Sequence, residues 1–186
     1  ARFPAQHIVH GIYAPYMGEE LPPTRAFQRE CPVIGYMGSK GHQGDLDLSV
    51  PALSRLLEER SDLMFEVFGT IRLPSTLLRF GHRVRHIEVK KAYMDFLLAL
   101  AGLGWDIGLA PLADTPFNRC KAPTKYIEYS ACNIPVVASN MPVYSRVMPE
   151  GGGELAADDW YERISRFLDH ADYRRQAITA ARAYCS

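Results

Sequence analysis

The feature that most constrains this fold is an alternation of short, continuous apolar segments with segments of helical periodicity. Helical spacing of apolar side chains predicts helices around Leu53, Leu56 and Leu57 and over residues 91–101 and 173–183. Apolar runs predict strands at residues 33–37, 63–68, 84–89, 106–112, 136–138 and near 154–155. Strands that are apolar on both faces are typical of a parallel sheet covered by helices on each side. The alternation therefore predicts an α/β domain with a doubly wound parallel sheet.

The alternation does not cover the whole chain. Residues 1–32 mix prolines, aromatics and charges, with a possible strand at residues 8–13, and we interpret them as a linker or arm. Residues 33–186 are expected to form the domain, and a chain of 186 residues suits one domain of this size. No internal repeat interrupts the pattern.

The charge balance excludes a general attraction to polyanions. Lys and Arg together number 21, as do Asp and Glu, so we expect no nucleic-acid partner and any anion must be bound by local geometry. The four cysteines show no CxxC and no zinc spacing, which favours reduced thiols in a cytoplasmic protein. No apolar run approaches the ~20 residues of a membrane span.

The most informative stretch is residues 117–138, which predicts a polar loop, a short helix, a turn and a buried strand. On a helical wheel Lys121, Lys125 and Glu128 fall on one side, and Ile127, Ala131 and Ile134 fall roughly opposite. A simple interpretation is a solvated face, with Lys125 and Glu128 an intrahelical pair worth ~0.2–0.5 kcal/mol.

The position of this helix favours a binding site instead. Ligands of such sheets sit outside the carboxyl ends of the strands, and a helix N-terminus there attracts anions. The residues expected at that edge are Gly38, Ser39, Gly69, residues 112–115, Ser139 and Asn140. Two lysines beside the helix predict a diphosphate cradle, and Glu128 could accept hydrogen bonds from ribose hydroxyls. A sugar nucleotide would satisfy all three features.

The glycine-rich loop at residues 38–45 matches neither GxGxxG nor GxxxxGK[ST]. Its backbone could approach a phosphate, or it could be an ordinary strand-to-helix turn. His42 could hydrogen-bond a bound sugar or have no functional role.

Asp45 and Asp47 resemble a metal-binding DxD, but their place beside a helix start favours capping, so we predict no metal and no cofactor. Cys120 and Cys132 are interpreted as a loop residue and a core residue.

Residues 128–139, EYSACNIPVVAS, resemble the E-A-M-A-C-G-x-P-V-V-A-S signature of retaining glycosyltransferases with the GT-B fold. The resemblance extends from Val33 to about Ala183 and includes the segments at residues 34–39 and 106–112. It implies a single Rossmann-like GT-B half-domain, the C-terminal half that binds the nucleotide-sugar donor.

The resemblance also implies roles for individual residues. Glu128 matches the second acid of the family's E-x7-E motif, which holds the donor's ribose, whereas the first acid falls on Cys120. Lys121 and Lys125 are then the expected catalytic residues, as in a subgroup from bacterial surface-polysaccharide clusters. The donor-binding residues expected from the loop and this pattern are Gly38, Ser39, His42, Asn118, Lys121, Thr124, Lys125 and Glu128.

The activity implied is transfer of a hexosyl group from a nucleoside-diphosphate sugar to an acceptor hydroxyl, with retention of the anomeric configuration. The lysines and the helix N-terminus would stabilise the departing diphosphate without a metal. The acceptor, a glycan or lipid-linked glycan, would need an N-terminal domain that residues 1–32 cannot build, so the chain alone is expected to bind donor weakly and catalyse nothing. Membrane association of a full-length protein stays open.

Two other classes share this architecture. A sugar-nucleotide epimerase or a phosphorylase is one alternative, but the strand-end loops offer few acids beyond Asp114 and Glu128, which favours transfer. A non-catalytic flavodoxin-like or receiver module is the other. A receiver would place an aspartate at the carboxyl end of a strand, whereas Asp106 opens its strand.

Overall fold

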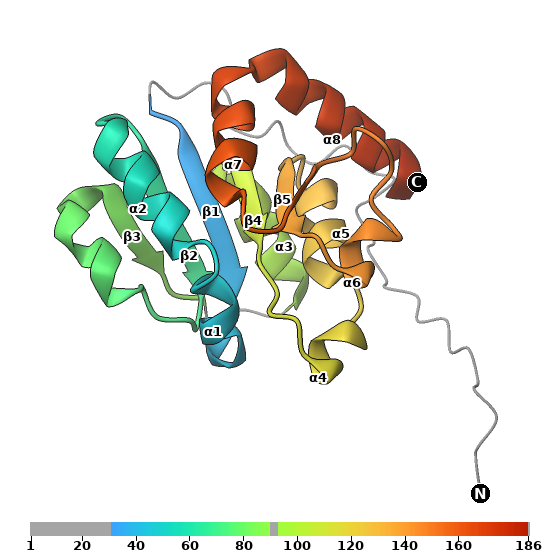
Figure 1. Cartoon of the computed structure of the whole chain (residues 1–186), viewed down its shortest axis with the longest axis horizontal. Helices are drawn as coiled ribbons and strands as arrows, with labels where there is room; N and C mark the ends of the chain where they lie inside the picture. The colour runs from blue at the N-terminus through green and yellow to red at the C-terminus, as the bar shows by residue number, and fades with distance from the viewer. Residues whose placement is uncertain (1–30, 90–92, 186) are drawn as a thin grey trace, which may run out of the picture.

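The computed structural model describes residues 31–89 and 93–185, and these residues form one parallel sheet with helices on both faces (Figure 1). The predicted strand at residues 8–13, and all but the last two residues of the predicted arm, lie outside the described residues. The sheet has six strands in the order β3-β2-β1-β4-β5-β6, and every pair is parallel. The strands are β1 (Val33–Gly38), β2 (Met64–Gly69), β3 (Val84–Ile87), β4 (Ile107–Ala110), β5 (Val136–Ser139) and β6 (Glu154–Ala156). The predicted α/β doubly wound sheet is confirmed.

Helices cover the sheet on both sides because the strands are buried on both faces. In β1, Val33 and Met37 join one apolar cluster and Ile34 and Tyr36 join the other, as the alternation of a strand requires. The helices are α1 (Gln43–Leu46), α2 (Val50–Glu59), α3 (Tyr93–Leu103), α4 (Pro116–Arg119), α5 (Thr124–Ala131), α6 (Pro142–Ser145), α7 (Trp160–Asp169) and α8 (Ala171–Cys185). Helices α3 and α5 contribute to the first cluster, and α2 and α7 contribute to the second.

The long periodic elements agree with the sequence, whereas several short helices were not expected from it. The predicted stripe of Leu53, Leu56 and Leu57 on α2 is fully buried. The 3-10 helices η1 (Lys40–His42) and η2 (Ser75–Arg83), together with α1 and α4, were not predicted. Apart from η2, which bends at Gly81, these are single turns of three or four residues, too short to show a hydrophobic period.

The helix of the informative stretch starts later than its charge pattern suggests. Helix α5 begins at Thr124, so Lys121 lies in the preceding loop and the shared helical face of Lys121, Lys125 and Glu128 is wrong. The expected division into one charged and one apolar side is also wrong, because Glu128 is buried and Ile127 is only half-buried. Two tyrosines, Tyr126 and Tyr129, supply the main packing face instead.

In the part of the chain that the structure describes, no helix combines the length and apolar character that a bilayer crossing requires.

Candidate functional site

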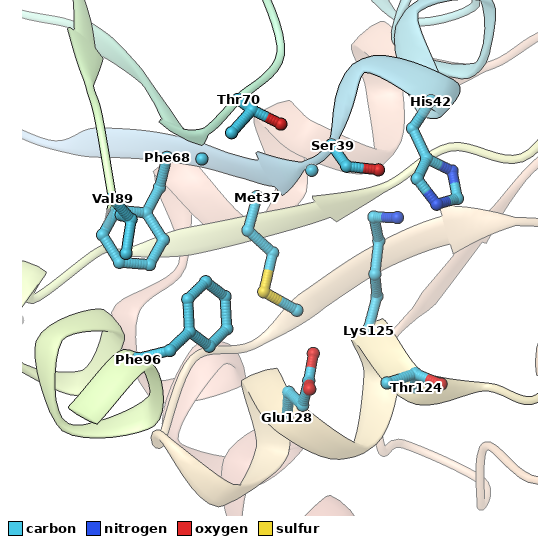
Figure 2. Close-up of a pocket in the computed structure, with 12 residues that line it drawn as sticks. Met37, Ser39, His42, Phe68, Thr70, Val89, Phe96, Thr124, Lys125 and Glu128 are labelled. Carbon is cyan, nitrogen blue, oxygen red and sulfur yellow. The ribbon is translucent and has the colours of Figure 1, made fainter. Parts of the chain in front are cut away.

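A cavity of about 570 Å³ opens at the carboxyl ends of β1 and β2, beside the first turns of α5 (Figure 2). Strand β1 lies at the point where the strand order reverses, since β2 and β3 follow on one side and β4 to β6 on the other. Ligands of doubly wound sheets bind in the crevice at such a point. The topology therefore marks this cavity as the candidate site.

Most of the predicted donor-binding residues meet at this cavity. Those that line it are Gly38, Ser39, His42, Thr124, Lys125 and Glu128. Lys121 lines a smaller cavity of about 130 Å³, which shares His42, Thr124 and Lys125 with the first. Asn118 lines neither cavity, because it is buried on α4 and its side-chain amide donates to the Asp45 carboxylate and to the Ala113 carbonyl.

An apolar wall of the cavity was missed by the sequence analysis. Phe68 at the end of β2 and Phe96 on α3 bring their ring centroids within 5.0 Å, at an interplanar angle of 33°. Figure 2 shows these rings together with Val89 at one end of the cavity and His42 and Lys125 at the other. Phe96 lies within the helix predicted over residues 91–101, and periodicity alone cannot distinguish a core position from a cavity wall.

Part of the cavity lining is backbone at the carboxyl ends of β1 and β2, where the two strands approach each other closely. Gly69 has a φ of 124°, and a Cβ atom there would lie 2.3 Å from the carbonyl oxygen of Gly38. That oxygen accepts hydrogen bonds from the amides of Thr70 at 3.1 Å and Ile71 at 3.3 Å. Gly69 is required for both its left-handed backbone and this close approach. It had been predicted at this edge of the sheet.

Tyr129 anchors α5 to the sheet at the switch point. Its hydroxyl accepts a hydrogen bond from the Met37 amide at 2.8 Å and donates one to the Leu109 carbonyl at 3.1 Å. These groups belong to β1 and β4, which pair directly only over residues 34–35 and 107–108. Burial raises the pKa of the Tyr129 hydroxyl well above its ordinary value, so the hydroxyl stays protonated and able to donate. The anchor fixes the helix that carries Lys125 and Glu128.

Lys125 and Glu128 bring opposite charges to a desolvated part of the cavity. Glu128 is 7% exposed, which removes the solvated-face interpretation. The pKa of Lys125 is lowered to about 8, mainly by burial and also by the Lys121 ammonium group, while Asp45 and Glu128 oppose the shift. The Lys125 ammonium also lies 5.5 Å from the centre of the Tyr36 ring. This lysine can bind an anion, and its charge can be titrated near physiological pH.

Asp45 connects the loop after β1 with the loop after β4. One of its carboxylate oxygens accepts from the Ala113 amide at 2.8 Å and from the Asn118 side-chain amide at 3.1 Å. The other lies 2.7 Å from Nδ1 of His42. The predicted capping role of Asp45 is wrong, because its acceptors are used by these groups. In the described residues, no group of three or more His, Cys, Asp or Glu side chains is arranged to hold a metal ion.

The residues around the smaller cavity complete a positively charged margin. The Lys121 ammonium lies 5.1 Å from the centre of the Phe117 ring, which is 75% exposed on α4. Cys120, at the position where the resemblance implies an acid, is an exposed residue at the end of α4. Cys132 is buried, as predicted, and burial raises its pKa to about 12, so it is an inert core thiol.

Comparison with known proteins gives structural matches only. No family model and no curated protein sequence matches the chain. Among solved structures, the chain resembles WaaG, a glycosyltransferase involved in lipopolysaccharide biosynthesis, with a TM-score of 0.64 and 19% identity over 84% of this chain and 43% of that one. It also resembles Anabaena HepE in complex with UDP and glucose, with a TM-score of 0.66 and 15% identity over 84% of this chain and 44% of that one.

A third match corresponds to a single domain. The C-terminal domain of a glycosyl transferase group 1 family protein, LpcC of Francisella tularensis, aligns with a TM-score of 0.64 and 12% identity. The alignment covers 84% of this chain and 87% of that domain, whereas this chain spans less than half of the WaaG and HepE structures. The predicted fold, a Rossmann-like GT-B half-domain, is therefore confirmed.

Proposed function

We propose that this chain, which has the fold of the C-terminal domain of group 1 glycosyltransferases, is the donor-binding domain of a glycosyltransferase. Its reaction is transfer of a sugar from a nucleoside-diphosphate sugar to an acceptor hydroxyl. The observation that carries the proposal is the switch-point cavity, which joins an aromatic wall, a buried carboxylate and a half-buried lysine on this fold. Each of the three suits a different part of a nucleotide sugar.

We propose the following distribution of the parts of the ligand in the cavity. The apolar wall of Phe68 and Phe96 takes the nucleoside, and the Glu128 carboxylate accepts hydrogen bonds from ribose hydroxyls. The N-terminal turn of α5, with Lys125, takes the diphosphate, because the dipole of a helix favours negative charge at its N-terminus. Lys121, in the adjoining cavity, adds a second ammonium group.

The catalytic contribution of this half is electrostatic. Cleavage of the sugar–phosphate bond leaves negative charge on the departing nucleoside diphosphate, and Lys121, Lys125 and the helix N-terminus would stabilise it. We propose that the transferred sugar retains its anomeric configuration and that the reaction needs no divalent cation. The carboxylate of Asp45, the first acid of the DxD sequence, already accepts from two N–H donors and contacts His42, which supports this.

The acceptor side is proposed to lie in a second domain. The chain spans 43% of WaaG and 44% of HepE, which supports a partner domain that would hold a glycan or lipid-linked glycan acceptor. Transfer by the full enzyme would then take place between the two domains. The chain of 186 residues by itself is expected to bind the donor without detectable sugar transfer. We propose that the full enzyme acts in the synthesis of a bacterial surface polysaccharide.

A ligand screen tests the function directly. Uridine, guanosine and thymidine diphosphate sugars should be compared by calorimetry and thermal shift. The sugar nucleotide with the preferred base is expected to raise the melting temperature most, because stabilisation grows with the logarithm of ligand concentration over Kd. Sugar transfer by the isolated chain would contradict the division into two domains. A lack of affinity for every nucleoside diphosphate would overturn the proposed function.

Replacing Lys121 by alanine should separate phosphate from nucleoside recognition. Because Lys121 lies at the second cavity, away from the aromatic wall, Lys121→Ala is expected to weaken a nucleoside diphosphate by about 1–2 kcal/mol and leave the bare nucleoside unchanged. Calorimetry with both ligands measures the difference, and the exposed Lys40, which lines neither cavity, gives the matched control Lys40→Ala. Equal losses for the two ligands would remove the phosphate role.

Affinity for a nucleoside diphosphate should also depend on pH. Lys125 is cationic below its pKa of about 8 and loses its charge as the pH rises through that value, so affinity is expected to fall on the alkaline side. Lys125→Arg should keep its charge throughout, because a guanidinium does not deprotonate in this range. A pH series of binding isotherms for both proteins tests this. A wild-type curve that stays flat through this range would show that Lys125 does not contact the phosphates.

A further inference from the structure

We propose that Asp45 is a positioning residue that keeps the proton of the neutral His42 imidazole on Nδ1, so that Nε2 is an acceptor for a sugar hydroxyl of the donor. The inference rests on the proposed function for the identity of the ligand, and on the hydrogen bonds of Asp45 for the state of the imidazole.

The hydrogen bonds around Asp45 determine which ring nitrogen carries the proton. The Ala113 amide and the Asn118 side chain both donate to Oδ1 of Asp45, so the carboxyl group serves as a hydrogen-bond acceptor. An ionised carboxylate can only accept, so Nδ1 of His42, 2.7 Å from Oδ2, must be the donor. In a neutral imidazole the other nitrogen, Nε2, then carries a lone pair.

The charges around His42 favour the neutral ring. Burial lowers the pKa of His42, and the Lys125 and Lys121 ammonium groups lower it further, while the bond to Asp45 opposes the shift. His42 lines both cavities, and its side chain is 24% exposed. Figure 2 shows its imidazole directed toward Lys125 at the same end of the cavity. Among residues 31–89 and 93–185, no hydrogen bond to Nε2 is present.

A lone pair at this position selects one part of the ligand. Ionised phosphate oxygens are acceptors and are repelled by Nε2, whereas a hydroxyl can donate to it. The ribose hydroxyls are assigned to Glu128, and the nucleoside to the aromatic wall at the other end of the cavity. The hydroxyl that reaches His42, beside the two lysines, is therefore one of the transferred sugar.

The first test needs neither ligand nor variant. Heteronuclear NMR of the imidazole nitrogens distinguishes the two neutral tautomers and the imidazolium form in the free protein. At neutral pH we expect His42 with a proton on Nδ1 and an unprotonated Nε2. A proton on Nε2, in either the other tautomer or the imidazolium, would overturn the proposal.

The second test uses Asp45→Asn. The amide can keep the acceptor toward Ala113 and then places its N–H₂ group against Nδ1, which moves the imidazole proton to Nε2, as replacing an orienting carboxylate by an amide does in catalytic triads. The NMR signature should therefore switch. Affinity for UDP-glucose should fall about tenfold, the scale of a lost hydrogen bond, while affinity for UDP stays within about twofold. The exposed Asp47 gives the control Asp47→Asn, which should change neither readout.

Failure of this inference and failure of the proposed function give different results. Equal losses of UDP and UDP-glucose in Asp45→Asn, or an unchanged tautomer, would overturn the role of Asp45 while leaving donor binding intact. A wild-type protein without affinity for any nucleoside diphosphate would count against the function, and the tautomer in the free protein would still decide the positioning role.

Discussion

Glu128→Gln is expected to weaken nucleoside-diphosphate binding by about 1–3 kcal/mol, the range for losing a charge-assisted hydrogen bond. Glu128 is 7% exposed and lines the cavity beside Lys125, so the proposed ribose contact is made in a desolvated place. Glutamine keeps the shape of the side chain but adds donors where the ribose hydroxyls already donate. Calorimetry with the base selected by the ligand screen measures the loss.

Two controls make the Glu128 result specific. Glu162→Gln removes an exposed carboxylate from the first turn of α7, far along the chain from the cavity residues, and should leave affinity unchanged. Thermal unfolding of both variants should show that the fold is intact. If Glu128→Gln binds as tightly as the wild type while folded, the ribose contact is wrong and the buried carboxylate has only a structural role.

Gly35→Ala is expected to lower the free energy of unfolding by about 3 kcal/mol or more, since inserting a methyl group into a packed core forces neighbours off their rotamers. A Cβ atom at Gly35 would lie 1.8 Å from the indole ring of Trp105. That ring cannot easily move, because it is fully buried and its Nε1 donates to Glu66 at 2.8 Å. Phe68, part of the cavity wall, packs edge-on against the same ring at 6.2 Å.

Urea denaturation of Gly35→Ala should therefore show a lower midpoint. The matched control is Gly102→Ala on α3, where an added Cβ meets nothing within 4 Å and the residue is exposed. Alanine is expected to stabilise that helix by ~0.5–1 kcal/mol. A Gly35→Ala midpoint equal to that of the wild type would mean that Trp105 has a second rotamer of similar energy.

The informative stretch shows how far a periodic pattern can be taken. Its prediction of a helix followed by a buried strand was right, and both α5 and β5 were found. The division of the helix into a charged and an apolar side was wrong, because Glu128 is buried in the cavity and Tyr126 and Tyr129 carry the packing. A helical wheel shows the spacing of side chains around a helix, but it does not show which neighbouring element packs against each side.

The carboxyl-edge rule explains which site residues were predicted. Gly38 and Gly69 end strands and Ser39 follows one, and parallel strands must bring their carboxyl ends to one edge. Phe96 was missed because its position on α3 has the same spacing as the core residues beside it. Asp45 was assigned to capping because its sequence neighbours are a helix start, whereas its partners Ala113 and Asn118 are far away along the chain.

The sequence by itself determined the sheet, because continuous apolar strands between amphipathic helices can be buried only as a parallel layer covered on both faces. It also determined that Lys125 and Glu128 follow that sheet's carboxyl edge. Only the tertiary structure decided what those residues face. The hydrogen bonds of Tyr129 to β1 and β4 and the wall of Phe68 and Phe96 arise from contacts across 20 to 92 residues, which no local pattern encodes. Asp45 lies only three residues from the imidazole that it holds, but its other partners, Ala113 and Asn118, are 68 and 73 residues away.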